Sequence, residues 1–335
     1  MITDVIQKLV ERTDLTEQEA RAVMEEIMTG QATDAQIAGF LTALRMKGET
    51  STELIGFARV MREKAEPLWN GEIPAVLDTC GTGGDGSGTF NISTAAAFVA
   101  AGAGVKVAKH GNRSASSKCG SADVMEALGL DIQMPIDRLR RAITEVGVGF
   151  LFAPRFHSSM KHVVPARQQL KIRTVFNMLG PLANPASAKY QVTGVSSMGI
   201  VEVIANALHG LGVDYAFVVH SSDGMDEISI SAPTYVVELR HGETRRFSIK
   251  PEDFGITPGP IAAILGGDAK TNAIIIEDVL KGERGRRRDV VLINAAAAIV
   301  AGGVAGTLKE GIRAAEESID SGTALKKLNQ LRTFL

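Results

Sequence analysis

Residues 81–94 read Gly81-Thr82-Gly83-Gly84-Asp85-Gly86-Ser87-Gly88-Thr89-Phe90-Asn91-Ile92-Ser93-Thr94. They follow a short apolar run, 75–77, that is typical of a buried strand, and they precede an alanine-rich segment, 95–101, that predicts a helix. A glycine-rich loop between a strand and a helix presents unpaired backbone N–H groups to an anion. We therefore predict a phosphate-binding loop, with Ser93 and Thr94 capping the helix or contacting the ligand.

Two familiar phosphate-loop patterns do not fit this spacing. The loop satisfies G-x-G-x-x-G, but a dinucleotide site also needs an acidic residue about 20 positions further on. The corresponding region, 106–110, is Lys-Val-Ala-Lys-His and is basic. A P-loop needs Lys and then Ser or Thr after its last glycine, whereas Ser-Gly follows Gly86. A turn without a ligand is also disfavoured, because five glycines within residues 81–88 carry an entropic cost.

The composition is that of a globular chain with little net charge. The 335 residues are 45% hydrophobic, which is enough for one large or two ordinary domains. The formal net charge of −2 gives no general attraction to nucleic acid or to an anionic membrane. Cys80 and Cys119 lack metal-ligand spacing, so we expect reduced thiols and a cytoplasmic protein. The beginning of the chain does not have the pattern of a signal peptide, and residues 290–306 predict a buried helix rather than a membrane span.

The first part of the chain contains helix-start signals that predict a small helical unit. Capping boxes are formed by Thr16 with Glu19, Thr33 with Gln36 and Thr50 with Glu53. Apolar residues at helical spacing follow these starts and favour core packing, although such a unit can also bury an apolar face against a second copy of itself. We expect a helical domain over residues 1–70, joined by helices from about 168–185, and a homodimer formed through it.

From residue 75 onward, apolar runs alternate with helical patterns, which predicts a mainly parallel sheet flanked by helices. The expected strands are 75–79, 105–108, 148–152, 190–195 and 215–219, followed by a hairpin of 235–239 and 244–249. The fold class is therefore α/β, with the helical domain as its smaller N-terminal part and an α/β domain made of 74–165 and 189–335. Because ligands collect at the carboxyl ends of strands in such sheets, the loops after the first, second and fifth strands should converge.

A second polar loop follows the second expected strand. Residues 109–123 place three cations, Lys109, Arg113 and Lys118, among hydroxyl groups and glycines. A run of charges is usually a solvated face, but a position beside the glycine-rich loop favours a second anion-binding loop.

The third polar loop, Asp223-Gly224-Met225-Asp226-Glu227, offers adjacent carboxylates. Mg²⁺ characteristically links one or two carboxylates to the phosphates of a substrate. An acidic surface turn is the commoner role of an Asp-Glu pair, yet the two anion loops favour a metal site here. We therefore expect Mg²⁺ as the cofactor.

Six blocks of this sequence occur in a highly specific order and spacing: 81–85, 91–94, 109–114, 120–123, 173–185 and 226–227. Together they closely resemble the anthranilate phosphoribosyltransferase family, nearly from end to end of the chain. The departures are small. Ser221 stands where the family usually has Gly, and Met225 replaces a common Leu.

The resemblance implies transfer of the phosphoribosyl group of 5-phosphoribosyl 1-pyrophosphate to the amine of anthranilate, with release of pyrophosphate, in tryptophan biosynthesis. It implies that phosphoribosyl pyrophosphate is held by Gly81, Gly83, Gly84, Asp85, Thr89, Asn91, Ile92, Ser93, Thr94, Lys109, His110, Gly111, Asn112, Arg113, Ser114, Ala115, Ser116, Ser117 and Ser121. It implies that anthranilate is bound by Gly81, Asn112 and Arg167, and that the metal is bound by Ser93, Asp226 and Glu227. His110 is a candidate acceptor for the departing amine proton, or it holds its loop through a bond to the backbone.

Two other functions fit parts of the sequence. Pyrimidine nucleoside phosphorylases resemble this fold, but they need no magnesium-binding carboxylate pair, so Asp226 and Glu227 disfavour them. A non-catalytic nucleic-acid-binding relative would use the cluster of Arg284, Arg286, Arg287 and Arg288. That cluster lacks interleaved aromatic residues, and the chain is slightly acidic. We therefore expect small-molecule substrates, and neither nucleic acid nor a membrane as a partner.

Overall fold

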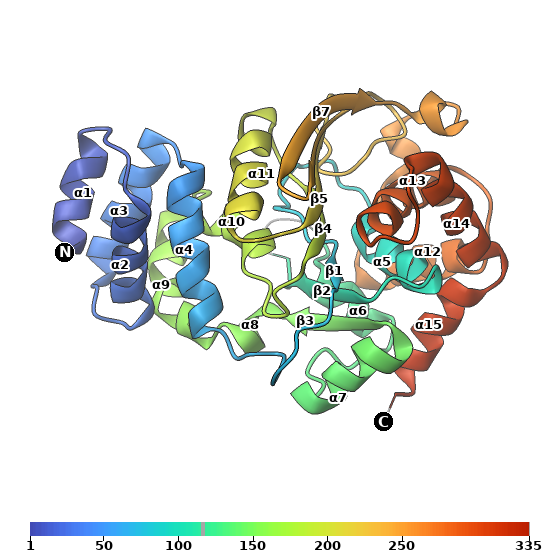
Figure 1. The fold of residues 1–335 in the computed structure, drawn as a ribbon, viewed down its shortest axis with the longest axis horizontal. Helices are drawn as coiled ribbons and strands as arrows, with labels where there is room; N and C mark the ends of the chain where they lie inside the picture. The colour runs from blue at the N-terminus through green and yellow to red at the C-terminus, as the bar shows by residue number, and fades with distance from the viewer. Residues whose placement is uncertain (115–117, 335) are drawn as a thin grey trace.

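A sheet of seven strands forms the centre of the computed structural model, which describes residues 1–114 and 118–334 (Figure 1). The strands are β1 Leu77–Asp78, β2 Val107–Gly111, β3 Val148–Phe152, β4 Tyr190–Gly194, β5 Tyr215–Ser221, β6 Thr234–Arg240 and β7 Glu243–Ile249. Strands β1 to β5 are parallel, and β6 and β7 form an antiparallel hairpin at one edge. The prediction of a mainly parallel sheet flanked by helices is confirmed.

The strand order creates a place for a ligand beside β1. The order is β3-β2-β1-β4-β5-β6-β7, so β1 pairs with β2 on one side and with β4 on the other. The chain builds outward from β1 to β3 and then crosses to the other side to continue with β4. In parallel sheets, such a reversal opens a crevice at the carboxyl ends of the two central strands. The loop that leaves β1 at this point is the glycine-rich segment.

The second strand is longer than the sequence indicated. We expected it to end at residue 108, which is wrong by three residues, because β2 continues to Gly111. Each of its residues pairs with β3, from Val107 with Val148 to Gly111 with Phe152. Lys109 and His110 therefore have the fixed orientation of strand residues rather than that of a loop.

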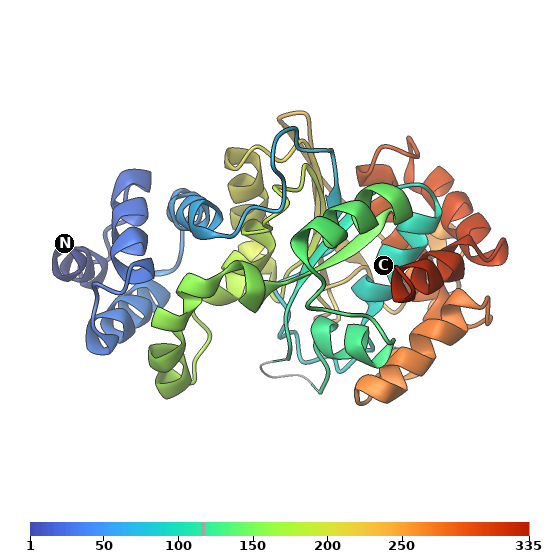
Figure 2. The same ribbon diagram turned by 90° about the horizontal axis from the view of Figure 1, so that it is seen from below.

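The N-terminal helices form a bundle that lies at one end of the molecule, far from the C-terminus in both views (Figures 1 and 2). They are α1 Ile2–Val10, α2 Glu17–Met28, α3 Asp34–Lys47 and α4 Ser51–Lys64. All three predicted capping boxes are present, at Thr16, Thr33 and Thr50. The bundle shares one hydrophobic core with α9 Val164–Leu170, α10 Phe176–Leu179 and α11 Val201–Gly210.

The face of the sheet opposite the N-terminal bundle is covered by α5 and by helices from the end of the chain. They are α5 Ile92–Gly102, α12 Ala269–Leu280, α13 Arg286–Ala301, α14 Leu308–Asp320 and α15 Thr323–Arg332. Alternate residues of β5 belong to two different hydrophobic cores. Phe217 and Val219 pack with these helices, whereas Ala216 and Val218 belong to the core that contains the N-terminal bundle. Helix α13 is buried from Val290 to Ala301, as predicted, but the prediction of a buried helix over 290–306 is wrong for 302–306, which lie beyond its end and are partly or fully exposed.

Shorter elements complete the chain. They are α6 Ser121–Ala127, α7 Ile136–Arg141 with a π-helical continuation at Ala142–Val146, α8 Ala153–Phe156, and 3-10 turns at Ser158–His162, Gly180–Leu182, Met198–Ile200, Pro251–Phe254 and Ile261–Ile264. Within 1–114 and 118–334, every helix is too short or too polar to cross a membrane.

Candidate active site

The glycine-rich loop is fastened to the end of β4 on one side and opens to solvent on the other. The Thr82 N–H donates to Gly194 O at 2.8 Å, and the Ser196 N–H donates to Thr82 Oγ1 at 3.1 Å. Beyond this anchor, Gly83 and Gly84 have φ values of 63° and 76°, in the left-handed region that favours glycine. The backbone at these two positions is exposed, as an anion-binding loop requires.

Helix α5 begins two residues earlier than the capping prediction required. Its first residue is Ile92 and its N-cap is Asn91, so Ser93 and Thr94 lie within the first turn and the prediction that they cap the helix is wrong. Ile92 is fully buried, and its N–H donates to Phe90 O at 2.7 Å, so neither its side chain nor its backbone faces solvent. The Asn91 side chain instead joins neighbouring segments, because its Nδ2 donates to Cys119 O at 3.3 Å and its Oδ1 accepts from Asn272 Nδ2 at 3.0 Å.

The acidic loop after β5 meets the glycine-rich loop directly. The Gly83 N–H donates to Asp226 Oδ2 at 3.0 Å, and the Asp226 N–H donates to Asp85 Oδ2 at 3.4 Å. Carboxylate oxygens of Asp85, Asp226 and Glu227 all lie within 4.8 Å of one another. Two of the three expected loops therefore form one site.

The three acids have the properties of an incomplete cation site. Glu227 Oε2 is buried and has no hydrogen-bond partner among residues 1–114 and 118–334. Burial raises the pKa of Asp226 and of Glu227, and the charge of Asp85 raises both further; the charge of Asp226 also raises the pKa of Glu227, whereas a hydrogen bond with Glu227 lowers that of Asp226. A divalent cation would supply the missing partner and remove the repulsion. Asp85, which we expected only to hold the substrate, thus becomes a third candidate carboxylate ligand.

Lys109 lies beneath the glycine-rich loop rather than at its surface. The side chain is 2% exposed, and its Nζ donates to Thr79 O at 2.8 Å, Thr79 Oγ1 at 3.1 Å and Ser93 Oγ at 3.3 Å. Burial lowers the pKa of Lys109, although nearby acids, including Asp78 and Glu227, oppose this effect. The ammonium group ties β2 to the end of β1 and to the first turn of α5.

His110 points into the protein. Its Nδ1 lies 3.1 Å from Gly180 O, its Nε2 is buried without a partner among the described residues, and its ring packs against that of His157. Burial, with a smaller contribution from His157, lowers the pKa of His110 to about 3. So weak a base is poorly suited to accept a proton at neutral pH. Of its two expected roles, the geometry favours the bond to the backbone.

The second polar loop is held by its own acids. Arg113 Nη1 contacts Asp123 at 2.9 Å and Glu126 at 2.5 Å, and the Ser114 N–H donates to Asp123 Oδ2 at 3.1 Å. Ser121 Oγ donates to the carbonyl of Asn112 at 3.3 Å. The expected ligand-binding residues Ala115, Ser116 and Ser117 lie outside the described residues.

The remaining predicted residues lie around this centre. Thr89 forms a bridge with Leu265, and a side chain at Gly81 would crowd the carbonyl of Gly194. Arg167 is half-buried on α9, with its guanidinium 5.5 Å from the centre of the Phe176 ring. No carboxylate of the described residues lies within ion-pair distance of it, and burial lowers its pKa. An unpaired, partly desolvated cation is suited to a carboxylate ligand.

One residue that contacts the glycine-rich loop has no role in the sequence analysis. Arg173 donates to the carbonyls of both Gly83 and Gly84. It belongs to block 173–185, whose resemblance was noted without a role for this arginine. A pairing across 89 positions leaves no pattern in a single sequence.

The cluster of arginines that suggested a nucleic-acid binder is largely paired with acids. Arg288 is 2% exposed and contacts Asp320 at 2.6 Å, Arg284 shares Asp320, and Arg286 pairs with Asp289.

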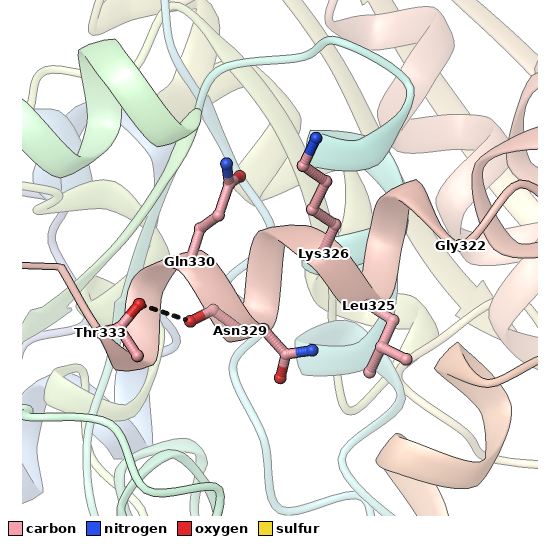
Figure 3. A pocket seen from close by; sticks show the side chains of 6 residues that line it. All are labelled: Gly322, Leu325, Lys326, Asn329, Gln330 and Thr333. Atoms are coloured by element: carbon pink, nitrogen blue, oxygen red, sulfur yellow. Dashed lines mark hydrogen bonds between the residues drawn. The ribbon is translucent and has the colours of Figure 1, made fainter.

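An open groove of about 410 Å³ lies along α15, lined by side chains such as Leu325, Lys326 and Asn329 (Figure 3). It contains none of the residues of the glycine-rich or acidic loops.

Comparison with protein families first defines the class. Residues 3–65 match the helical bundle domain of the glycosyl transferase family, and residues 73–325 match the a/b domain of the same family. The protein is a glycosyl transferase with both domains in the order that its structure shows.

Full-length relatives then narrow the family. The chain is 54% identical to the anthranilate phosphoribosyltransferase of Symbiobacterium thermophilum, over 98% of this chain and 96% of the relative, and 52% identical to that of Roseiflexus castenholzii, over 99% and 98%. The crystal structure of the Thermus thermophilus anthranilate phosphoribosyltransferase matches with a TM-score of 0.93 and 44% identity, over 99% of both chains. The Saccharomyces cerevisiae enzyme in complex with PRPP and Mg matches with a TM-score of 0.90 and 30% identity, over 98% of this chain and 96% of that one. The chain belongs to the anthranilate phosphoribosyltransferase family, which confirms the resemblance seen in the sequence.

Proposed function

We propose that this chain transfers the phosphoribosyl group of 5-phosphoribosyl 1-pyrophosphate to the amine of anthranilate. The products are N-(5-phosphoribosyl)anthranilate and pyrophosphate, and the reaction belongs to tryptophan biosynthesis. The full-length relatives carry this activity in their names. The single structural observation that supports it most is the bond from Gly83 to Asp226, because it joins phosphate-binding amides to metal-binding acids in one site.

Mg²⁺ is the cofactor that fits this site. Asp226 and Glu227 would hold it, with Ser93 from the first turn of α5 and with Asp85 close by. The buried, unpaired Glu227 Oε2 supports this assignment. When bound, the ion would neutralise the charge that grows on the leaving pyrophosphate.

The glycine-rich loop and the adjoining segments would bind phosphoribosyl pyrophosphate. The N–H groups of Gly84 and Asp85, which bond to no described residue, and the N-terminus of α5 would provide donors to its phosphates. Lys109 would act mainly from beneath, as a buried positive charge that holds Ser93 in place. Residues His110 to Ser117 and Ser121 belong to the same proposed set of phosphoribosyl pyrophosphate-binding residues.

Anthranilate would be recognised by Gly81, Asn112 and Arg167. The planar guanidinium of Arg167 can pair with the carboxylate of anthranilate through two parallel bonds. Its lack of an acidic partner among the described residues supports this role. The amine would then face the anomeric carbon of the other substrate.

The reaction needs alignment more than it needs a base. The bond between the anomeric carbon and the pyrophosphate oxygen breaks, the amine nitrogen bonds to that carbon, and the amine loses a proton. An aromatic amine is already neutral at pH 7, so it attacks once the two substrates are aligned. Donors fixed in advance around the leaving group stabilise its charge without reorganisation.

Domain limits, assembly and location form part of the same proposal. The shared core of α1 to α4 with α9 and α10 supports a helical domain of residues 1–70 and about 168–185, and an α/β domain of 74–165 and 189–335. A homodimer formed through the helical domain is part of the same proposal. The enzyme would act in the cytoplasm, in keeping with two cysteines that do not form a disulfide with each other.

A fluorescence assay tests the activity. Anthranilate fluorescence should disappear when the chain is mixed with anthranilate, phosphoribosyl pyrophosphate and Mg²⁺, and it should persist when EDTA is added. Persistent fluorescence in the complete mixture, together with phosphate-dependent cleavage of a pyrimidine nucleoside, would instead support a phosphorylase. Salt-sensitive retention of nucleic acid on a filter without turnover would support a binding protein.

A further inference from the structure

Arg173 grips two consecutive carbonyl groups of the glycine-rich loop. Its Nη1 donates to Gly84 O at 3.0 Å, and its Nη2 donates to Gly83 O at 3.0 Å and to Ser196 Oγ at 3.1 Å. A β-carbon added at Gly84 would overlap Arg173 Nη1, so the guanidinium lies directly against the loop. The bonds from Arg173 to the two carbonyls therefore require a glycine at position 84.

These bonds fix the direction of two N–H groups that bond to no described residue. A peptide unit is planar and trans, so its C=O and N–H point in opposite directions. Since the carbonyls of Gly83 and Gly84 point to Arg173, the N–H groups of Gly84 and Asp85 point away from it. Neither N–H has an acceptor within residues 1–114 and 118–334. Two successive unpaired N–H groups in left-handed glycine geometry form a concave anion-binding surface.

The shape of the arginine side chain suits this task better than its charge alone. A guanidinium presents several donors in a rigid plane and can satisfy two carbonyls at once, whereas a lysine ammonium is a flexible point charge. The third bond, to Ser196, connects the grip to the end of β4, where Ser196 also bonds to Thr82. The loop is therefore held at Thr82 and again at Gly83 and Gly84.

We propose that Arg173 is a positioning residue that turns the N–H groups of Gly84 and Asp85 toward the pyrophosphate of the substrate. The proposal rests on the proposed function for the identity of that substrate. Arg173 acts through the loop and is not required to touch the phosphates.

Calorimetric titration of the full chain with inorganic pyrophosphate and Mg²⁺ tests the proposal, with Arg173→Ala and Arg173→Lys as the variants. Both should weaken pyrophosphate binding by about tenfold or more, because a misplaced contact of this kind is costly. The KM for phosphoribosyl pyrophosphate should rise in parallel, and the KM for anthranilate should change little. The lysine variant is decisive, because it keeps the positive charge but loses the planar guanidinium that donates to two carbonyls at once.

Arg155→Ala is the matched control. Arg155 is also half-buried and also donates to two consecutive carbonyls, those of Gln133 at 2.6 Å and Met134 at 2.8 Å, but it follows the edge strand β3. It should leave pyrophosphate binding unchanged, and the melting temperatures of the variants should show that all are folded.

Three results would overturn the proposal. They are wild-type affinity in Arg173→Ala, wild-type affinity in Arg173→Lys, and an equal loss in Arg155→Ala. Failure of the proposed function looks different: the wild type would bind pyrophosphate and Mg²⁺ but would not consume anthranilate, and the comparison of the variants would still apply.

Discussion

The backbone N–H of Gly83 donates to Asp226 Oδ2 at 3.0 Å, although 143 positions of the chain separate the two residues. The first belongs to the loop after β1 and the second to the loop after β5. Because the same carboxylate is a candidate metal ligand, a bound cation and the glycine-rich loop would share one anchor. Metal binding and pyrophosphate binding should therefore depend on each other.

Asp226→Asn should lower kcat/KM by roughly a hundredfold or more, because it removes a charge that holds the cation on the leaving group. Raised Mg²⁺ should restore part of the loss, and steady-state kinetics over a range of Mg²⁺ concentrations measures both effects. Asp214→Asn is a suitable control, since Asp214 is exposed just before the opposite end of β5. Turnover of Asp226→Asn at the wild-type rate would remove Asp226 from the metal site.

Arg167→Ala should weaken anthranilate binding by roughly ten- to a hundredfold, the effect of losing hydrogen bonds between charged groups. Calorimetry should show nearly unchanged binding of phosphoribosyl pyrophosphate. The control is Arg245→Ala, because Arg245 also stacks on a phenylalanine, Phe247 at 5.1 Å, but lies on the β6–β7 hairpin. The reverse pattern of affinities would reassign Arg167 to the other substrate.

Asn184→Ala should destabilise the fold by about 2–4 kcal/mol, because it leaves buried polar groups unpaired. Asn184 Nδ2 donates to Asp78 Oδ2 at 2.7 Å and to Ala108 O at 2.9 Å, and its Oδ1 accepts from the Ala186 N–H at 2.7 Å. Urea unfolding measures the change. The exposed Asn329 provides the control as Asn329→Ala, and equal midpoints for the two variants would contradict the role of Asn184.

The contribution of the buried histidines to the free energy of unfolding should fall as the pH drops from about 6.5 toward 4, whereas the buried acids Asp78 and Asp226, whose pKa values burial raises to about 6, act in the opposite direction. Burial lowers the pKa of His110 to about 3 and that of His157 to about 4. In this pH range the unfolded chain takes up protons on histidine, whose ordinary pKa is about 6.5, and the folded chain does not, so acid favours unfolding.

Urea midpoints measured across that range check the prediction. The difference in midpoint between His157→Asn and the wild type should change with pH in favour of the variant as the pH falls, whereas for His209→Asn, at an exposed position of α11, the difference should stay constant. Parallel curves for the wild type and His157→Asn would contradict the assignment of this effect to the buried ring.

Local signals predicted much of this fold. Thr16, Thr33 and Thr50 cap their helices as expected, because a capping box is satisfied within four residues. The apolar runs became strands because such runs fit the buried centre of a parallel sheet, although the first, expected over 75–79, is a strand only at Leu77–Asp78. The end of β2 was predicted less well, since only pairing with β3 decides that Lys109 to Gly111 are extended.

Sequence patterns predicted the functional groups that lie within a single loop. They predicted less well the contacts between segments that are distant in the sequence. The acidic pair and the glycine-rich loop each carry a chemical pattern in sequence. The approach of Asp85 to Asp226 and the grip of Arg173 on Gly83 and Gly84 depend on strand order, which no local pattern contains. The early start of α5 likewise follows from the buried position of Ile92.

A crystal structure of the wild-type chain with phosphoribosyl pyrophosphate and Mg²⁺ would test the central claim most directly. We expect the pyrophosphate beside the N–H groups of Gly84 and Asp85, with Mg²⁺ between it and the carboxylates of Asp226 and Glu227. Pyrophosphate bound at residues 284–288, or Mg²⁺ bound away from these two carboxylates, would contradict the account.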